Sequence, residues 1–271
     1  MSPRLTVLFS TIDDRIKQLL QKELPIIPEV RYLVVWQRTK PTDSLEHLVE
    51  DSTKKQPMDV IRLEGKGISR NRNAAIKALQ TEFAIFSDDD VEYTEEQLKM
   101  VIQSFYEQSF ADILLFQMSD YEGHLMKNYP SFPYDYRNAP KRTFVSSCEI
   151  AFRKTAAIPF FDERFGLGSD YLTVGEEEVF IHEAASKGLN ITYIPKVVCR
   201  TNPSTTSKRL KDDDKFWRSK GAVNYMLHGK CLSVMKAAKY AFVSPYSRTV
   251  HRFCEMLKGI NYVANTNHKK L

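Results

Sequence analysis

The strongest constraint on the fold is the alternation of short apolar segments with longer amphipathic segments over the first 118 residues. The amphipathic segments have the length and apolar spacing of helices. This alternation is typical of βαβ units, which build a mostly parallel sheet flanked by helices. The expected strands are Leu5–Ser10, Val30–Trp36, Asp59–Leu63, Phe83–Phe86 and Ala111–Met118. The clearest helices expected beside them are Ser69–Gln80 and Thr94–Ser109.

The pattern changes after residue 118. A loop rich in Tyr, Pro and Asn (120–140) leads to a helix near Glu176–Lys187 and a strand at Ile191–Ile194. The spacing beyond Ser207 is helical to about Asn261. We therefore expect an α/β fold with a mixed, mostly parallel sheet in residues 1–205. A mainly helical C-terminal segment, residues 206–271, follows it.

Charge is unevenly distributed between these two parts. Residues 206–271 hold 14 Lys and Arg against 4 Asp and Glu, a net charge of +10, whereas residues 1–205 hold 25 against 30, a net charge of −5. A basic segment beside an acidic body suggests an anionic partner, and a solvated basic face is the equal alternative. Neither a signal peptide nor a membrane span is expected, and the four scattered cysteines fit reduced thiols. These features predict a cytoplasmic protein.

Three consecutive carboxylates, Asp88, Asp89 and Asp90, directly follow the apolar segment Phe83–Phe86. Ligands of open α/β sheets bind at the carboxyl ends of the strands, so this is the expected place for a site. In an extended segment alternate residues face the same way, so Asp88 and Asp90 point together and Asp89 does not. Two convergent carboxylates suit Mn²⁺ or Mg²⁺, with phosphate oxygens and water as further ligands. The competing interpretation is a solvated acidic turn.

Two further segments carry chemistry. Residues 65–73 join a predicted strand to a predicted helix with two glycines and three cations, a suitable cradle for a diphosphate. Residues 175–181 place three glutamates at a helix start. There Glu177 shares a predicted inward face with Phe180 and Ile181, from which its carboxylate would accept a proton from an acceptor hydroxyl. The alternative is that these acids only complement the helix dipole.

The order of these motifs, followed through Phe161–Phe165, resembles that of the family 2 inverting glycosyltransferases with the GT-A (Rossmann-like) fold. The resemblance covers about residues 4–205. It implies that Thr11 lies against a nucleotide base, that Asp88 and Asp90 serve the metal, and that Glu177 is the catalytic base. Other implied contacts with the nucleotide-sugar are Gln37, Arg70, Arg72, Asn73, Asp88 and Asp89. The implied wall beside donor sugar and acceptor is Gly168, Ser169, Asp170 and Glu176.

The sequence departs from the family pattern at two places. Many relatives have an acidic residue just after the second strand, where this chain has Gln37 and Arg38. Many also have a metal-binding His after the last core strand, and residues 198–203 contain none. The departures concern base recognition and metal coordination, and leave the class unchanged.

The resemblance implies a metal-dependent transferase that moves a sugar, from UDP by default, to a hydroxyl with inversion. The implied setting is bacterial surface-polysaccharide assembly, with a glycan or lipid-linked oligosaccharide as acceptor. The basic segment is expected to contact anionic membrane, to pack on the core or to form a homodimer. Alternatives are a nucleotidyltransferase, a non-catalytic relative and a nucleic-acid-binding module. The segment lacks finger, RRM or KH signatures, so no nucleic acid is expected.

Overall fold

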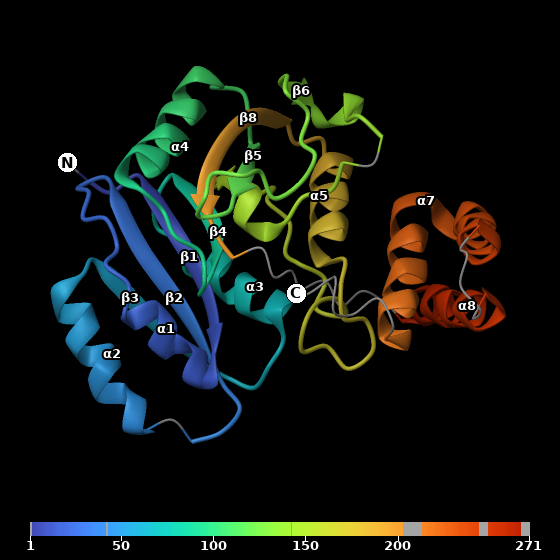
Figure 1. Cartoon of the computed structure of the whole chain (residues 1–271), viewed down its shortest axis with the longest axis horizontal. Coiled ribbons are helices and arrows are strands. Elements are labelled where there is room, and N and C mark those ends of the chain that lie inside the picture. Colours follow the sequence, from blue (N-terminus) through green and yellow to red (C-terminus); the bar gives the residue numbers. More distant parts are fainter. Residues whose placement is uncertain (1, 42, 142, 203–212, 244–248, 267–271) are drawn as a thin grey trace. The chain divides into compact units, whose positions relative to one another are not determined.

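The computed structural model describes residues 2–41, 43–141, 143–202, 213–243 and 249–266 (Figure 1). These residues form two compact units. Unit 1 comprises the described residues within 1–66, 70–160 and 184–203, and unit 2 comprises those within 67–69, 161–183 and 204–271. Each unit is made of segments that are distant in sequence. The functional boundary expected between residues 205 and 206 stays a prediction.

Unit 1 is built on a single eight-stranded sheet. Its strands are β1 (Leu5–Ile12), β2 (Val30–Arg38), β3 (Met58–Glu64), β4 (Phe83–Asp88), β5 (Ile113–Ser119), β6 (Tyr134–Asp135), β7 (Ile150–Arg153) and β8 (Ile191–Arg200). Their order across the sheet is β3-β2-β1-β4-β7-β5-β8-β6. The strands β1 to β4 pair in parallel, as do β5 and β8. This confirms the mixed, mostly parallel sheet that the alternating pattern predicts.

The antiparallel part of the sheet is what the pattern did not predict. Strand β7 lies between β4 and β5 and runs antiparallel to both, and β6 adds an antiparallel edge to β8. Strand β6 lies within the long loop 120–140 and β7 follows it. They have only two and four residues, too few for a clear periodicity.

Three helices of unit 1, α1 (Ile16–Leu20), α2 (Asp43–Lys55) and α4 (Glu95–Glu107), contribute buried side chains to one apolar core. The strands contribute alternate residues to the same core, as expected for one face of a sheet. Members of this core from β1 and from the helices are Leu5, Val7, Phe9, Ile16, Leu45, Leu98 and Phe105. Helix α4 begins after Thr94 with a capping box in which Gln97 is the partner, as the sequence indicates.

Helix α3 (Ile68–Ala78) follows β3, and helix α5 (Glu176–Ser186) precedes β8. From α3, Asn71 is buried and its side-chain amide donates to the Val35 carbonyl at 2.8 Å. This hydrogen bond fixes the helix against β2. Short 3₁₀ turns occur at Asp13–Arg15, Tyr136–Asn138 and Ser147–Glu149.

In unit 2 the helices α7 (Asp214–Val243) and α8 (Thr249–Asn265) pack closely against each other (Figure 1). Two glycines make this approach possible. A Cβ at Gly221 would overlap the backbone of Met256, and one at Gly259 would overlap the Arg218 carbonyl. Glu255 is buried between the helices and pairs with Arg218 and Lys258. The described residues thus contain the expected helical C-terminal segment. The helical structure expected for residues 207–212 lies outside the described residues.

A loop segment of unit 2 is attached to the same helices. The guanidinium of Arg164 pairs with the buried Asp162 at 2.6 Å and donates to the Thr266 carbonyl at 2.8 Å, just beyond α8. Gly175 has a φ of +97°, and a Cβ there would overlap the Val223 side chain from α7. These contacts fix the entry to α5. Within the described residues, no helix combines the length and apolar character that crossing a bilayer requires.

Replacing Gly259 by Ala tests the close helix contact. The added Cβ would force α7 and α8 apart, and overpacking of this kind costs about 1–3 kcal/mol of the free energy of unfolding. We expect a lower midpoint of thermal unfolding, followed by circular dichroism, than in wild type. Asn261→Ala, at an exposed position of the same helix, serves as the control. Equal midpoints for the two variants would contradict the close contact.

Candidate functional site

The acidic triplet 88–90 lies where β4 ends, beside the end of β1. Its middle member, Asp89, is 2% exposed. The Thr11 hydroxyl donates to one Asp89 oxygen at 2.7 Å, and the Arg15 guanidinium pairs with both oxygens. A buried carboxylate is costly unless it is paired and hydrogen-bonded, and here both conditions are met.

The structure gives Thr11 and Asp89 a structural role that was not expected. The family resemblance implies that both contact a nucleotide-sugar. In the structure they hydrogen-bond to each other, and Thr11 is 4% exposed. Their observed role is to hold the ends of β1 and β4 together. Direct contact of either with a nucleotide stays a prediction.

Asp88 and Asp90 are less buried, each with 41% of its side chain exposed. The Arg15 guanidinium lies 4.0 Å from Asp90, and the Arg72 guanidinium lies 3.5 Å from Asp88. Burial raises the pKa of Asp90, and the neighbouring carboxylates of Asp88 and Asp89 raise it further, while Arg15 lowers it. A cation bound here would favour the ionised form of Asp90, so the residues present suit a divalent metal.

Other carboxylate and imidazole groups also lie close together. Among the described residues, two groups of three lie close enough to share an ion. Asp120, Glu122 and His124 lie in a turn, and the Glu255 of the second group, with Asp214 and His251, already pairs with two cations. The triplet 88–90 instead offers two protein ligands at a strand end, which leaves coordination positions for phosphate and water.

The basic junction 65–73 is partly buried. Arg72 and Asn73 are 3% and 1% exposed, and the Arg72 guanidinium donates to the Ser147 hydroxyl at 2.8 Å. Arg70 is exposed and donates to the Glu64 carbonyl at 2.6 Å. Arg72 is therefore a buried neighbour of Asp88 and adds positive charge to the acidic end of β4. Arg70 and Lys66 remain at the surface of the junction.

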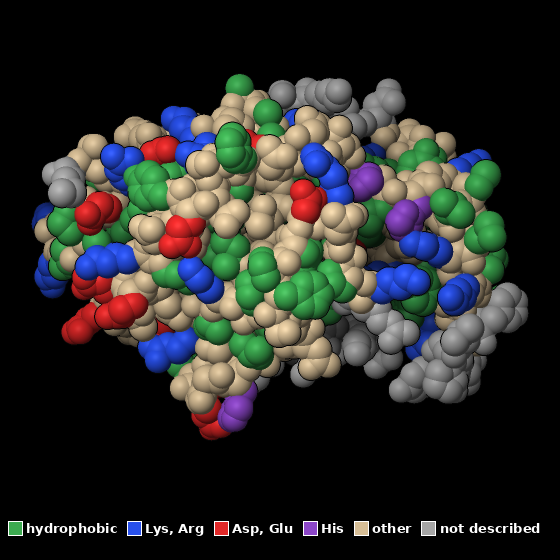
Figure 2. All heavy atoms as spheres, turned by 90° about the horizontal axis from the view of Figure 1, so that it is seen from above, with side chains coloured by type: hydrophobic (Ala, Val, Ile, Leu, Met, Phe, Trp, Pro, Cys, Tyr) green, Lys and Arg blue, Asp and Glu red, His purple; other side chains and the backbone are tan. Residues whose placement is uncertain are grey.

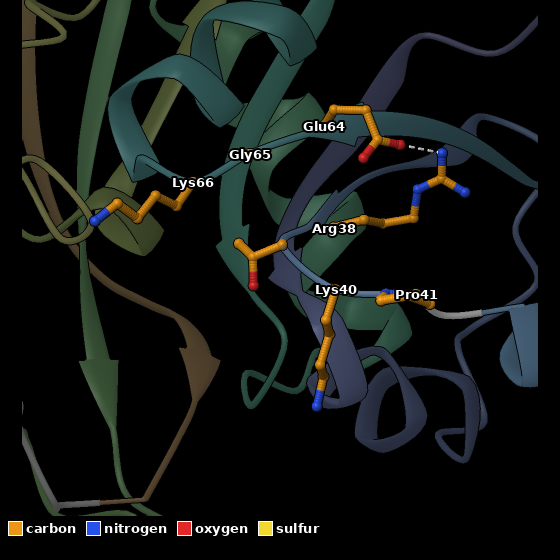
Figure 3. Close-up of a pocket in the computed structure, with 7 residues that line it drawn as sticks. Arg38, Lys40, Pro41, Glu64, Gly65 and Lys66 are labelled. Carbon is orange, nitrogen blue, oxygen red and sulfur yellow. Dashed lines mark hydrogen bonds and ion pairs between the residues drawn. The ribbon is translucent and has the colours of Figure 1, made fainter.

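A pocket of about 680 Å³ lies at the carboxyl ends of β2 and β3 (Figure 3). Its volume is within the range of small-molecule sites. The lining residues are Arg38, Thr39, Lys40, Pro41, Glu64, Gly65 and Lys66. Arg38 pairs with Glu64, whereas the ammonium ends of Lys40 and Lys66 extend away from that pair (Figure 3). Gln37, expected to contact a nucleotide, precedes this lining and is 3% exposed.

The turn after β1 contains residues that the sequence analysis did not select. Asp13 has a φ of +47°, a conformation that Asp tolerates better than most residues. Its carboxylate accepts from the backbone N–H of Thr39 at 2.7 Å and from the Thr39 hydroxyl at 2.6 Å. The adjacent Asp14 pairs with Lys40. The signal in the sequence is an Asp-Asp-Arg run shortly after a predicted strand.

In unit 2 the candidate catalytic glutamates begin α5. Glu176 is 6% exposed, whereas Glu177 and Glu178 are partly exposed. The buried residues Val179 and Phe180 lie three and four positions after Glu176, so this glutamate shares their face. Glu178 lies 3.6 Å from Lys220. Phe180 and Ile181, expected on one inward face with Glu177, are buried, but Glu176 is more buried than Glu177. The role of Glu177 as the base stays a prediction.

The predicted wall residues also lie in unit 2. Gly166, with a φ of +100°, lies close to the start of α5. A Cβ at this position would lie 3.1 Å from the Glu176 carboxyl carbon. The Ser69 hydroxyl donates to the Phe165 carbonyl at 2.7 Å. Gly168 and Asp170 are exposed, and the Ser169 hydroxyl donates to the Leu172 carbonyl. Hydrogen bonds thus fix the loop at Phe165 and at Leu172, while Gly168 and Asp170 between them are exposed.

Comparisons with solved structures identify similar folds. A structure of residues 1–349 of S. aureus TarS in complex with UDP-GlcNAc has 18% identity and a TM-score of 0.59, over 95% of this chain and 81% of that one. A structure of the same region with UDP has 21% identity and a TM-score of 0.58, over 91% and 73%. Mannosyltransferase PcManGT from Pyrobaculum calidifontis, in complex with GDP-Man and Mn²⁺, has 11% identity and a TM-score of 0.50, over 98% and 88%.

At these identities the likeness concerns the fold, which is the GT-A type. No curated protein matches the sequence. The model of the family described as glycosyl transferase family 2 matches residues 9–160, more than half of the chain and including the acidic triplet. This protein is therefore a member of glycosyl transferase family 2.

Proposed function

We propose that the protein transfers a sugar from a nucleotide-sugar to an acceptor hydroxyl, in a metal-dependent reaction that inverts the anomeric carbon. The observation that carries the proposal is the end of β4, where a buried, paired Asp89 leaves Asp88 and Asp90 partly exposed. Membership of glycosyl transferase family 2 supports the reaction class. The structural neighbours bound to UDP-GlcNAc and to GDP-Man with Mn²⁺ support a nucleotide-sugar donor and a divalent cation.

The donor half of the reaction belongs to unit 1. Asp90, with Asp88 beside it, would hold a divalent cation that compensates the charge of the diphosphate leaving group. The pocket between the ends of β2 and β3 would receive part of the nucleotide, since it has suitable size and carries Lys40 and Lys66. Our default nucleotide is UDP. The chemistry of the pocket does not require it, so GDP is the first alternative to test.

The acceptor half belongs to unit 2. Glu177 would take the proton of the attacking hydroxyl, and the partly exposed loop 166–170 would contact donor sugar and acceptor. A single displacement by that hydroxyl inverts the anomeric carbon and releases a nucleoside diphosphate. Release of pyrophosphate would instead indicate a nucleotidyltransferase. We further assign the acceptor to the glycans or lipid-linked oligosaccharides of bacterial surface-polysaccharide assembly.

Asp90→Asn tests the metal-dependent donor site. Because a ligand that binds the folded state stabilises it, wild type should unfold at a higher temperature with UDP or a UDP-sugar and Mn²⁺ than with either component alone. The variant should lose this increase in unfolding temperature, because a neutral amide does not offset the charge of a bound cation. Asp51→Asn, at an exposed position of α2, is the matched control and should respond as wild type does. A normal increase in Asp90→Asn would contradict the proposed role, and a larger one with GDP would change the nucleotide.

Glu177→Gln tests the catalytic base. Loss of general-base catalysis typically lowers turnover by about 10²–10⁴-fold, so kcat should fall that much while donor binding stays as in wild type. The matched control is Glu178→Gln, next on the same helix, which should keep near-normal turnover.

The buried neighbour provides a second comparison for the same prediction. Near-normal turnover in Glu177→Gln together with a large loss in Glu176→Gln would move the base to Glu176. Near-normal turnover in both variants would reject a glutamate base at the start of α5. The products should be analysed in parallel, because inversion predicts a β-linked product from an α-linked donor, observable by nuclear magnetic resonance.

A further inference from the structure

The second half of α7 has two distinct faces. Gly229, with a φ of +73° and a ψ of 178°, interrupts the helix, and residues 230–243 continue in a new direction. Ser233 and Ala237 are fully buried, and Ala237 packs with Met256 of α8. At 100° per residue, the side of the helix opposite Ser233 and Ala237 is the outward face.

The outward face carries large apolar side chains. Leu232 and Met235 are 52% and 67% exposed. Tyr240, 55% exposed, lies outside this face, nearer the side of Ala237. Val250, in the first turn of α8, is 72% exposed. Exposed apolar side chains are ordinary when they occur singly, but those at 232 and 235 lie one turn apart on one face.

The same part of α7 carries cations: residues 230–243 contain three lysines and no Asp or Glu. Lys230 and Lys239 are exposed, and Lys236 lies beside His228. From Lys215 to Cys254 the sequence has eight Lys and Arg residues and no Asp or Glu. In the space-filling view, basic and apolar side chains of the C-terminal helices lie next to one another (Figure 2).

The acids on the elements packed against this region are paired. Asp214, at the start of α7, lies 2.7 Å from His251. Glu255 of α8 is 1% exposed, and it pairs with Arg218 and Lys258. The lysines therefore give the outward face of α7 a positive electrostatic potential.

We propose that the outward face of α7, centred on Leu232, Met235 and Lys239, docks on the surface of an anionic lipid bilayer. An interfacial helix places its apolar side chains at the boundary of headgroups and acyl chains, and its lysines reach the anionic headgroups. Charge complementarity selects this partner over a second copy of the chain, because a symmetric contact would bring the same lysines together. The inference goes beyond the proposed function, since docking requires neither donor nor catalysis.

The test is flotation of the full chain with vesicles, without nucleotide or metal. We expect binding to vesicles of phosphatidylcholine with phosphatidylglycerol, and little binding to phosphatidylcholine alone. Because each surface lysine contributes about fivefold to binding an anionic membrane, Lys236→Gln/Lys239→Gln should lower the partition coefficient by about 30-fold. Leu232→Ser/Met235→Ser should lower it by about tenfold or more.

Matched controls lie in unit 1. Ile26 and Phe110 are 72% and 88% exposed, so Ile26→Ser/Phe110→Ser removes two apolar side chains that are more exposed than Leu232 and Met235. Lys54→Gln/Lys99→Gln removes two exposed cations from other helices. Both controls should bind vesicles as wild type does, and circular dichroism should show that every variant is folded.

Three results would overturn the proposal. The first is equal binding to neutral and anionic vesicles, and the second is binding that the α7 variants leave unchanged. The third is a dimer in sedimentation velocity that Leu232→Ser/Met235→Ser converts to a monomer, with no vesicle binding by wild type. That outcome would make the face a contact between copies. None of these results depends on transferase activity, so failure of the docking and failure of the proposed reaction are distinguishable.

Discussion

The buried carboxylate of Asp89 is the interaction on which the candidate donor site depends. Thr11, at the end of β1, and Arg15, in the following turn, occupy its oxygens, so one carboxylate ties together the carboxyl ends of two neighbouring strands. A charge at this depth persists because it is paired and hydrogen-bonded. With Asp89 held inward, Asp88 and Asp90 remain partly exposed on either side of it.

Much of this architecture is predictable from the sequence because it depends on periodicity. The parallel strands are continuous apolar segments separated by helices, and they appear in the structure within a few residues of their expected bounds. Strand β7 was not predictable in this way. Its four residues are set by pairing with β4 and β5 after a long excursion of the chain, which is a tertiary effect without a local signal.

The site was predictable in position but not in detail. The triplet 88–90 follows an apolar segment in the sequence, and this position alone predicts that the candidate site lies at the end of β4. Arg15 was missed because an arginine in a polar turn has no distinguishing pattern, and its importance comes from a partner 74 residues away. At α5, the apolar spacing correctly predicts that Phe180 and Ile181 are buried, but it does not distinguish Glu176 from Glu177. Glu176 is the more buried of the two and lies close to Gly166, a contact between residues ten positions apart that has no signal in the helix periodicity.

The central claim is that Asp88 and Asp90 hold a divalent cation together with the donor diphosphate. Electron paramagnetic resonance tests it directly, because free Mn²⁺ gives a signal that is lost on binding. In the presence of UDP, wild type should remove more Mn²⁺ from solution than UDP alone does, and Asp88→Asn/Asp90→Asn should not. Equal removal of Mn²⁺ by the folded double variant would contradict the account, and the metal site would then lie elsewhere in the chain.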